Sequence, residues 1–99
     1  MKVNPRNIKT IEDLKDFLTN YFKGKSVKIY LFGSRAEKKE RYNSDIDLAF
    51  ESEEDISQDL ALIEEILDES NLIYKVDLVN LKFAPYLIEE VKSKGVRWL

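Results

Sequence analysis

The chain has 99 residues and a formal net charge of −3, and it contains neither cysteine nor histidine. This length suits one domain, so we expect a single domain over residues 1–99. The acidic balance argues against general nucleic-acid binding, which needs clustered positive charge. The missing residue types exclude disulfides, thiolate nucleophiles, cysteine-based zinc sites and imidazole bases. Any catalysis must therefore use carboxylates, hydroxyls, Lys, Arg or a hard cation held by oxygen ligands.

No stretch of the sequence is typical of a membrane protein or an exported protein. Apolar runs stay far below the roughly 18 residues of a membrane span. The first residues, MKVNPRNIKT, lack the apolar centre of a signal peptide. We therefore expect the cytoplasm as the location.

The first half of the chain predicts one helix followed by two strands. Thr10 is followed by two acids, which is typical of a helix N-cap, and apolar residues then recur at helical spacing up to Gly24. Residues 27–32 are rich in β-branched and aromatic residues and predict a strand. Residues 46–50 predict a second short strand, after a polar connection.

The second half predicts a helix, a strand and a last helix. The apolar residues of 56–69 recur at the period of an amphipathic helix, and 72–81 contains a third strand. Pro85 is expected to open the last helix at a first-turn position, and Gly95 to end it before a short extended tail. This order indicates an α/β (α+β) protein with a small sheet of three to four strands and flanking helices.

Two carboxylates flank a single apolar residue where the second strand begins. On a strand, residues two apart point to the same side, so Asp45 and Asp47 would aim together at one place. Their repulsion would be relieved by a cation, and magnesium takes oxygen ligands from one or two carboxylates plus phosphate and water. Taken alone, an Asp-x-Asp sequence also suits a solvated strand start.

A third acid, Asp77, lies in the middle of the third predicted strand. The helix over 56–69 is long enough for a crossover connection, so the second and third strands could be neighbours. Three converging carboxylates would then suit a two-metal site for phosphoryl displacement. Alternatively, Asp77 pairs with Lys75 or Lys82, of which Lys75 shares its side of the strand.

Gly33 and Ser34 follow the first strand and fit a phosphate-binding position. In an antiparallel pair they would lie at the same edge of the sheet as the Asp-x-Asp sequence. Glycine permits close approach of the backbone to a phosphate, and Ser34 offers a hydroxyl and an amide. Arg35 is a candidate phosphate ligand, although an ordinary turn and a surface arginine would also explain these residues.

These motifs together resemble the signature of the DNA polymerase β-like nucleotidyltransferase superfamily. The sequence has GS at 33–34, ten residues, then DIDL at 45–48, and a later acid in VDLV at 76–79. The short chain and Ser44 before the acids are similar to its minimal nucleotidyltransferases, which act as antitoxins to HEPN-domain toxins. The resemblance covers about residues 10–98, and it implies the palm-like fold of DNA polymerase β.

The resemblance also implies a mechanism. Asp45 and Asp47 would bind two magnesium ions, and Asp77 would bind the second metal and orient the attacking hydroxyl. Gly33 and Ser34 would hold the phosphates of ATP, with Arg35 stabilising charge. The transferred group would be AMP, and the acceptor a tyrosine hydroxyl of a HEPN-type partner toxin.

A second hypothesis keeps the same fold and site but assigns neutralisation of the partner by binding, without turnover. The three acids favour the enzyme, whereas Glu37, where related sequences often carry a small residue, favours the binding module. Apolar residues near the C-terminus could form the partner contact. For Trp98, packing onto the core is the alternative.

Overall fold

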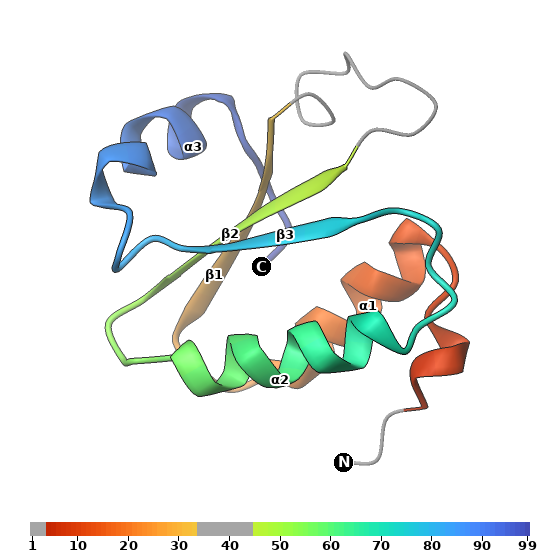
Figure 1. Cartoon of the computed structure of the whole chain (residues 1–99). Helices are drawn as coiled ribbons and strands as arrows, with labels where there is room; N and C mark the ends of the chain where they lie inside the picture. Colours follow the sequence, from red (N-terminus) through yellow and green to blue (C-terminus); the bar gives the residue numbers. More distant parts are fainter. Residues whose placement is uncertain (1–3, 34–44) are drawn as a thin grey trace.

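The computed structural model describes residues 4–33 and 45–99, and its centre is a mixed β-sheet with helices on both faces (Figure 1). Strand order is β3-β2-β1-β4. α1 and α2 cover one face, and α3 covers part of the other. The elements are η1 (Pro5–Asn7), α1 (Ile11–Tyr21), β1 (Val27–Phe32), β2 (Ile46–Ser52), α2 (Ser57–Asp68), β3 (Val76–Asn80), η2 (Pro85–Leu87), α3 (Ile88–Lys94) and β4 (Val96–Arg97). Within the ranges described, no helix is long and apolar enough to cross a membrane.

α1 begins where the sequence predicted, at a complete capping box. The Asp13 backbone N–H donates to Thr10 Oγ1 at 3.1 Å, and the Thr10 backbone N–H donates to Asp13 Oδ2 at 3.1 Å. These reciprocal bonds satisfy N–H groups that have no partner inside the helix. The backbone N–H groups of Lys9 and Thr10 also lower the pKa of Asp13.

Strand pairing confirms the predicted neighbours. β1 and β2 are antiparallel, with Phe32 opposite Asp47, so the end of β1 lies beside the start of β2. β2 and β3 are parallel and are joined through α2, which is the expected crossover. The C-terminal tail, expected only to be extended, pairs with β1 as the short edge strand β4.

The alternation of side chains along β2 separates the core from the candidate site. Ile46, Leu48 and Phe50 are fully buried in the main core beneath α1 and α2. Ala49 points the other way, into a smaller cluster formed with Val91 of α3. Asp47 has the same parity as Ala49, so its carboxylate lies on the face opposite the main core.

One expectation for the C-terminal region needs correction, and one open alternative is decided. Pro85 does not open an α-helix directly: Pro85–Leu87 forms a 3₁₀ turn, and the α-helix begins at Ile88. Ala84 offers no side-chain oxygen as a cap, and the Ile88 backbone N–H donates to Pro85 O instead, which closes a tighter turn. Trp98 is half-buried against the main core, and its backbone N–H donates to Ile29 O at 2.8 Å, so the core alternative holds for this residue.

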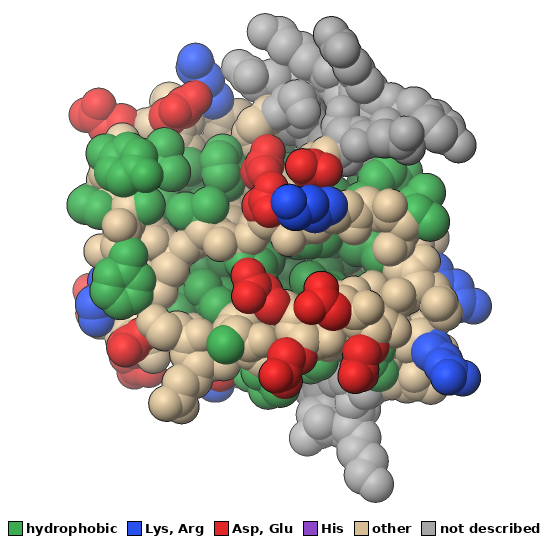
Figure 2. All heavy atoms as spheres, in the orientation of Figure 1, with side chains coloured by type: hydrophobic (Ala, Val, Ile, Leu, Met, Phe, Trp, Pro, Cys, Tyr) green, Lys and Arg blue, Asp and Glu red, His purple; other side chains and the backbone are tan. Residues whose placement is uncertain are grey.

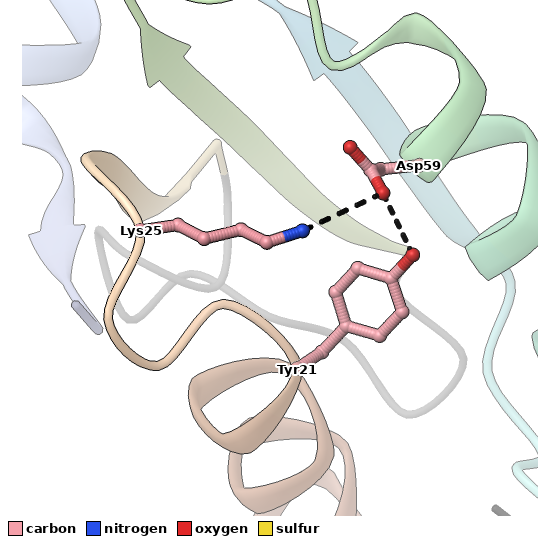
Figure 3. Close-up of polar contacts among 3 residues, drawn as sticks. All are labelled: Tyr21, Lys25 and Asp59. Carbon is pink, nitrogen blue, oxygen red and sulfur yellow. Dashed lines mark hydrogen bonds and ion pairs between the residues drawn. The ribbon is translucent and has the colours of Figure 1, made fainter. Parts of the chain in front are cut away.

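A polar cluster joins the end of α1 to the start of α2 (Figure 3). The Tyr21 hydroxyl donates to Asp59 Oδ1 at 2.8 Å, and Lys25 Nζ lies 4.0 Å from the same oxygen. Lys25 Nζ also lies 5.6 Å from the centre of the Tyr21 ring, within range of a cation–π contact. Burial, followed by the hydrogen bond to Asp59 and its charge, raises the pKa of Tyr21 to about 12.

Replacing Tyr21 with Phe should lower the free energy of unfolding by about 1 kcal/mol, because the substitution removes one partly buried hydrogen bond to a charged group. Chemical denaturation monitored by circular dichroism measures this change. Tyr86→Phe is the matched control, because the Tyr86 side chain is 81% exposed. Equal stability of wild type and Tyr21→Phe would show that the Tyr21–Asp59 bond contributes nothing.

Candidate functional site

Two acids face each other across adjacent strands. Asp47 of β2 and Asp77 of β3 are directly paired in the parallel register. Both lie on the sheet face opposite the main core, because their neighbours Ile46 and Val76 point into that core. The sequence predicted this approach from the crossover and the side-chain parity, and the strand register confirms it.

Asp45, the residue before β2, adds a third carboxylate near this pair. It is exposed, and the adjacent Ile46 backbone N–H donates to Lys75 O at 2.8 Å, which holds the start of β2 against the residues that precede β3. The charge of Asp45 contributes to the electrostatic environment of Asp47. Three negative groups are therefore present at one end of the β2–β3 pair, where Figure 2 shows acidic side chains around a basic one.

Asp47 is held in an environment that disfavours its charge. Burial raises the pKa of the Asp47 carboxyl, and the charges of Asp77 and then Asp45 raise it further, as does a side-chain hydrogen bond with Asp77. A cation between the carboxylates would reverse these effects, because it favours the charged form. The donor set therefore fits a hard divalent ion such as Mg²⁺.

Lys75 provides a partial counter-charge. Its Nζ lies 3.9 Å from Asp77 Oδ1, so one of the two pairings considered for Asp77 from the sequence is present. The side chains are 74% and 46% exposed, and such pairs contribute little to stability. In the two described ranges, no three Asp, Glu, His or Cys side chains form a group that could hold a metal. Asp47 and Asp77 would thus need water and phosphate as further ligands for Mg²⁺.

Gly33 directly follows β1 and lies beside Asp47. Its φ of +78° lies in the left-handed region, and a Cβ built on it would be 2.5 Å from Asp47 Oδ2. Glycine is therefore required both by the backbone conformation and by the close approach of the carboxylate. Ser34 and Arg35, the other predicted phosphate ligands, lie outside the described residues, as does Glu37.

A hollow of about 330 Å³ adjoins Asp77 at the outer edge of the sheet. It lies between the second half of α2 and β3 and includes Glu64 and Asp68, which sequence reasoning did not single out. Both are exposed helix acids four residues apart, a pattern that in the sequence looks like an ordinary solvated face.

A larger hollow, of about 890 Å³, lies around the start of β1 and the end of β2. Its lining includes Lys23, Lys28, Lys92 and Arg97, and none of the predicted site residues. The predicted site therefore lies at the opposite end of these strands, and Asp77 is its one described residue that also lines the smaller hollow.

Asp47→Asn should raise the midpoint of thermal unfolding by a few degrees at pH 7 without Mg²⁺. The folded state raises the pKa of Asp47 above its ordinary 3.8, so folding stability falls as pH rises through the raised pKa. The gain should therefore shrink as the pH approaches 3.8, where wild-type Asp47 is protonated too. Differential scanning fluorimetry across this pH range measures the effect.

Asp16→Asn is the control for that experiment, because Asp16 is exposed on α1 and the substitution changes the net charge equally. Millimolar Mg²⁺ should stabilise wild type and Asp16→Asn, and should stabilise Asp47→Asn less. A lower unfolding temperature for Asp47→Asn at pH 7 would contradict the assignment of repulsion at this position.

Gly33→Ala and Gly24→Ala form a matched pair of substitutions. Both glycines have a left-handed φ, +78° and +81°, but the Cβ position of Gly24 has no atom within 4 Å. Each substitution should lower the free energy of unfolding by about 1 kcal/mol through the backbone. Only Gly33→Ala should also reduce stabilisation by Mg²⁺, because its methyl group displaces the Asp47 carboxylate. Equal Mg²⁺ responses in both variants would remove Gly33 from the site.

Comparison with known proteins identifies the family. The family described as "Polymerase beta, Nucleotidyltransferase" matches residues 12–97, which is most of the chain. No curated protein matches the chain.

Two solved structures are similar to the chain over 91% of its length and 73% of theirs. One is a crystal structure of a toxin–antitoxin with AMP-PNP, with a TM-score of 0.59 and 27% identity. The other is a mutant of the toxin–antitoxin MntA-HpeT in which two aspartates, two positions apart, are replaced by glutamate; its TM-score is 0.58 and its identity 25%. The family match and the mixed sheet with flanking helices agree, and the chain belongs to the polymerase beta nucleotidyltransferase family.

Proposed function

We propose that the chain is the antitoxin of a toxin–antitoxin pair and transfers AMP from ATP to a tyrosine hydroxyl of a HEPN-type toxin. Membership of a nucleotidyltransferase family supports the reaction class. Similarity to a toxin–antitoxin with AMP-PNP, an ATP analogue, supports the nucleotide and the kind of partner. The HEPN identity and the tyrosine acceptor come from the resemblance of the sequence motifs to minimal nucleotidyltransferases.

The observation that carries the proposal is the pairing of Asp47 with Asp77 across two parallel strands. Burial, followed by the charges of Asp77 and Asp45, raises the pKa of Asp47, and this unfavourable arrangement contributes nothing to the stability of the fold. Asp45 adds a third negative charge nearby. A divalent cation bound beside the carboxylates would replace this repulsion by attraction, and it would also attract the phosphates of a nucleotide.

In the proposed reaction, the acceptor hydroxyl oxygen attacks the α-phosphorus of ATP. A new oxygen–phosphorus bond forms, the bond from the α-phosphorus to the bridging oxygen breaks, and pyrophosphate leaves with that electron pair. Asp45, Asp47 and Asp77 would hold Mg²⁺, and Asp77 would also orient the hydroxyl and accept its proton. Bound Mg²⁺, two ions by analogy with the family, would supply charge neutralisation at the attacking and leaving oxygens.

The residues after β1 would bind the phosphates. Gly33 lets the backbone approach closely beside Asp47, and Ser34 and Arg35 follow it in sequence with a hydroxyl and a positive charge. Such groups stabilise the charge that develops on leaving pyrophosphate.

A second candidate function is neutralisation of the toxin by binding alone. The observation in its favour is that the described residues hold no ready group of three metal-ligating side chains. The Lys75–Asp77 pair also partly neutralises one of the acids without any metal. The two candidates predict different outcomes in a single labelling experiment.

That experiment incubates wild type and Asp47→Asn with α-labelled ATP, Mg²⁺ and a lysate of the source cell. The proposed reaction should transfer label to one protein band with wild type, and reduce it at least 100-fold with Asp47→Asn, because a metal-binding carboxylate is lost. Asp16→Asn should label like wild type. Capture of a partner without any labelling would favour binding alone, and equal labelling by Asp47→Asn would remove Asp47 from the site.

A further inference from the structure

One edge of the sheet is open among the described residues. β3 has β2 on one side and no described strand on the other, whereas β4 forms the opposite edge (Figure 1). β4 has only two residues, while β3 has five, in an unbroken register with β2 and without proline. β3 therefore lacks the proline, the bulge and the shortness by which proteins protect an edge from further pairing.

The hydrogen bonds at the two ends of β3 show which of its backbone groups face β2. Lys75 O accepts from the Ile46 N–H at 2.8 Å, and the Leu81 N–H donates to Phe50 O at 2.9 Å. Successive residues of a strand direct their N–H and C=O groups to opposite sides. The odd-numbered residues of β3 therefore bond to β2, and the even-numbered residues face the open edge.

The backbone groups at the open edge are suited to pairing with another strand. The even-numbered residues are Val76, Leu78 and Asn80, and Asn80 O already accepts from the Phe83 N–H at 3.0 Å. The N–H and C=O of Val76 and Leu78, and the N–H of Asn80, remain directed outward. Backbone groups of this kind bond to water or to an added strand.

A strand on this edge would extend a row of residues across the face of the sheet that carries the acids. Asp77 lies opposite Asp47, Asp47 lies opposite Phe32, and Gly33 follows Phe32. The residue of an added strand opposite Asp77 would point to this same face, because residues at one level share a face. Its side chain, Asp77, Asp47 and Gly33 would then follow one another across the sheet. This order suits an in-line displacement, with the attacking oxygen and the leaving pyrophosphate on opposite sides of the carboxylates.

The charges beside the edge favour a segment of another protein over a second copy of this chain. Glu64 and Asp68 of α2 and Asp77 of β3 line the hollow at this edge, against Lys75 alone. A second copy paired through its own β3 would bring these acids toward the same acids of its partner, which is unfavourable. A segment with Lys or Arg beside the acceptor would be attracted instead.

We propose that the open edge of β3 binds an extended segment of the protein substrate as an additional antiparallel strand, with the residue that carries the acceptor hydroxyl opposite Asp77. The proposal rests on the function proposed above and adds how the acceptor is presented. The segment would bond to the backbone of Val76 and Leu78. The acceptor residue and Asp77 would then form a non-hydrogen-bonded pair, the closer kind, with Cα atoms about 4.5 Å apart.

The test measures fluorescence anisotropy of the full chain with a labelled, end-capped peptide, Lys-Val-Tyr-Val-Lys, and two N-methylated forms of it. In the proposed pairing the N–H groups of both valines face β3, whereas those of tyrosine and the second lysine face away. Methylation of the two valine nitrogens should therefore weaken binding at least about tenfold. The matched peptide, methylated on the tyrosine and second lysine nitrogens, should bind within about twofold of the unmodified peptide.

Val76→Pro and Val76→Ala form the matched pair on the protein side. Both replace the valine side chain, but only proline removes an N–H that faces the open edge, and a strand tolerates proline at its first residue. Val76→Pro should bind the unmodified peptide about fivefold more weakly than Val76→Ala. Circular dichroism shows whether both variants fold, and the comparison of peptides on wild type does not depend on them.

Equal affinities of the two methylated peptides, or no binding of the unmodified peptide at about 1 mM, would overturn the edge site. Stabilisation of wild type by ATP with Mg²⁺ is measured in parallel. If ATP with Mg²⁺ gives no stabilisation, the proposed function fails, whatever the peptides do. If it stabilises the chain but the two methylated peptides bind equally, only the edge site fails.

Discussion

The side-by-side placement of Asp47 and Asp77 is the feature on which the candidate site depends. Two carboxylates on neighbouring strands repel each other in the free protein, and the pKa of the Asp47 carboxyl is raised. Their place on the sheet follows from the side-chain alternation that buries Ile46 and Leu48 on the other face. The same alternation that forms the core therefore exposes the acids together, and a slip of one residue in β2 would bury Asp47.

The crossover through α2 makes this pairing possible. The parallel pairing of β2 and β3 brings Asp77 level with Asp47, and a parallel connection needs a long crossover such as this helix. The buried residues Leu60 and Ile63 fix α2 beneath the sheet. Its exposed face is then free to carry acids beside β3. One helix thus supports the carboxylate pair and also shapes the neighbouring hollow.

Much of this arrangement could be predicted because short-range signals agreed with the fold. The capping residue Thr10 marked the start of α1, and the β-branched and aromatic run 27–32 matched β1 residue for residue. Side-chain parity placed the acids on one side of the sheet. The assignment of metal and nucleotide roles to them remains a prediction.

Other features depended on contacts that no local pattern encodes. The close approach of Gly33 to Asp47 requires the register of β1 on β2. The hollow requires α2 and β3 to be placed in space, and in the sequence its acids Glu64 and Asp68 look like an ordinary helix surface. The pairing of β4 likewise requires the edge of β1 that β2 leaves open. The 3₁₀ turn at Pro85, in contrast, is closed by a local backbone hydrogen bond.

The position of Trp98 has a practical consequence for spectroscopy. It is the single tryptophan of the chain, and it packs against the main core, on the face of the sheet away from Asp47 and Asp77. Its intrinsic fluorescence should therefore report the loss of the core on unfolding. Because the indole is separated from the carboxylates by the sheet itself, ligands that bind there should leave its emission nearly unchanged, and an extrinsic dye would be needed to follow them.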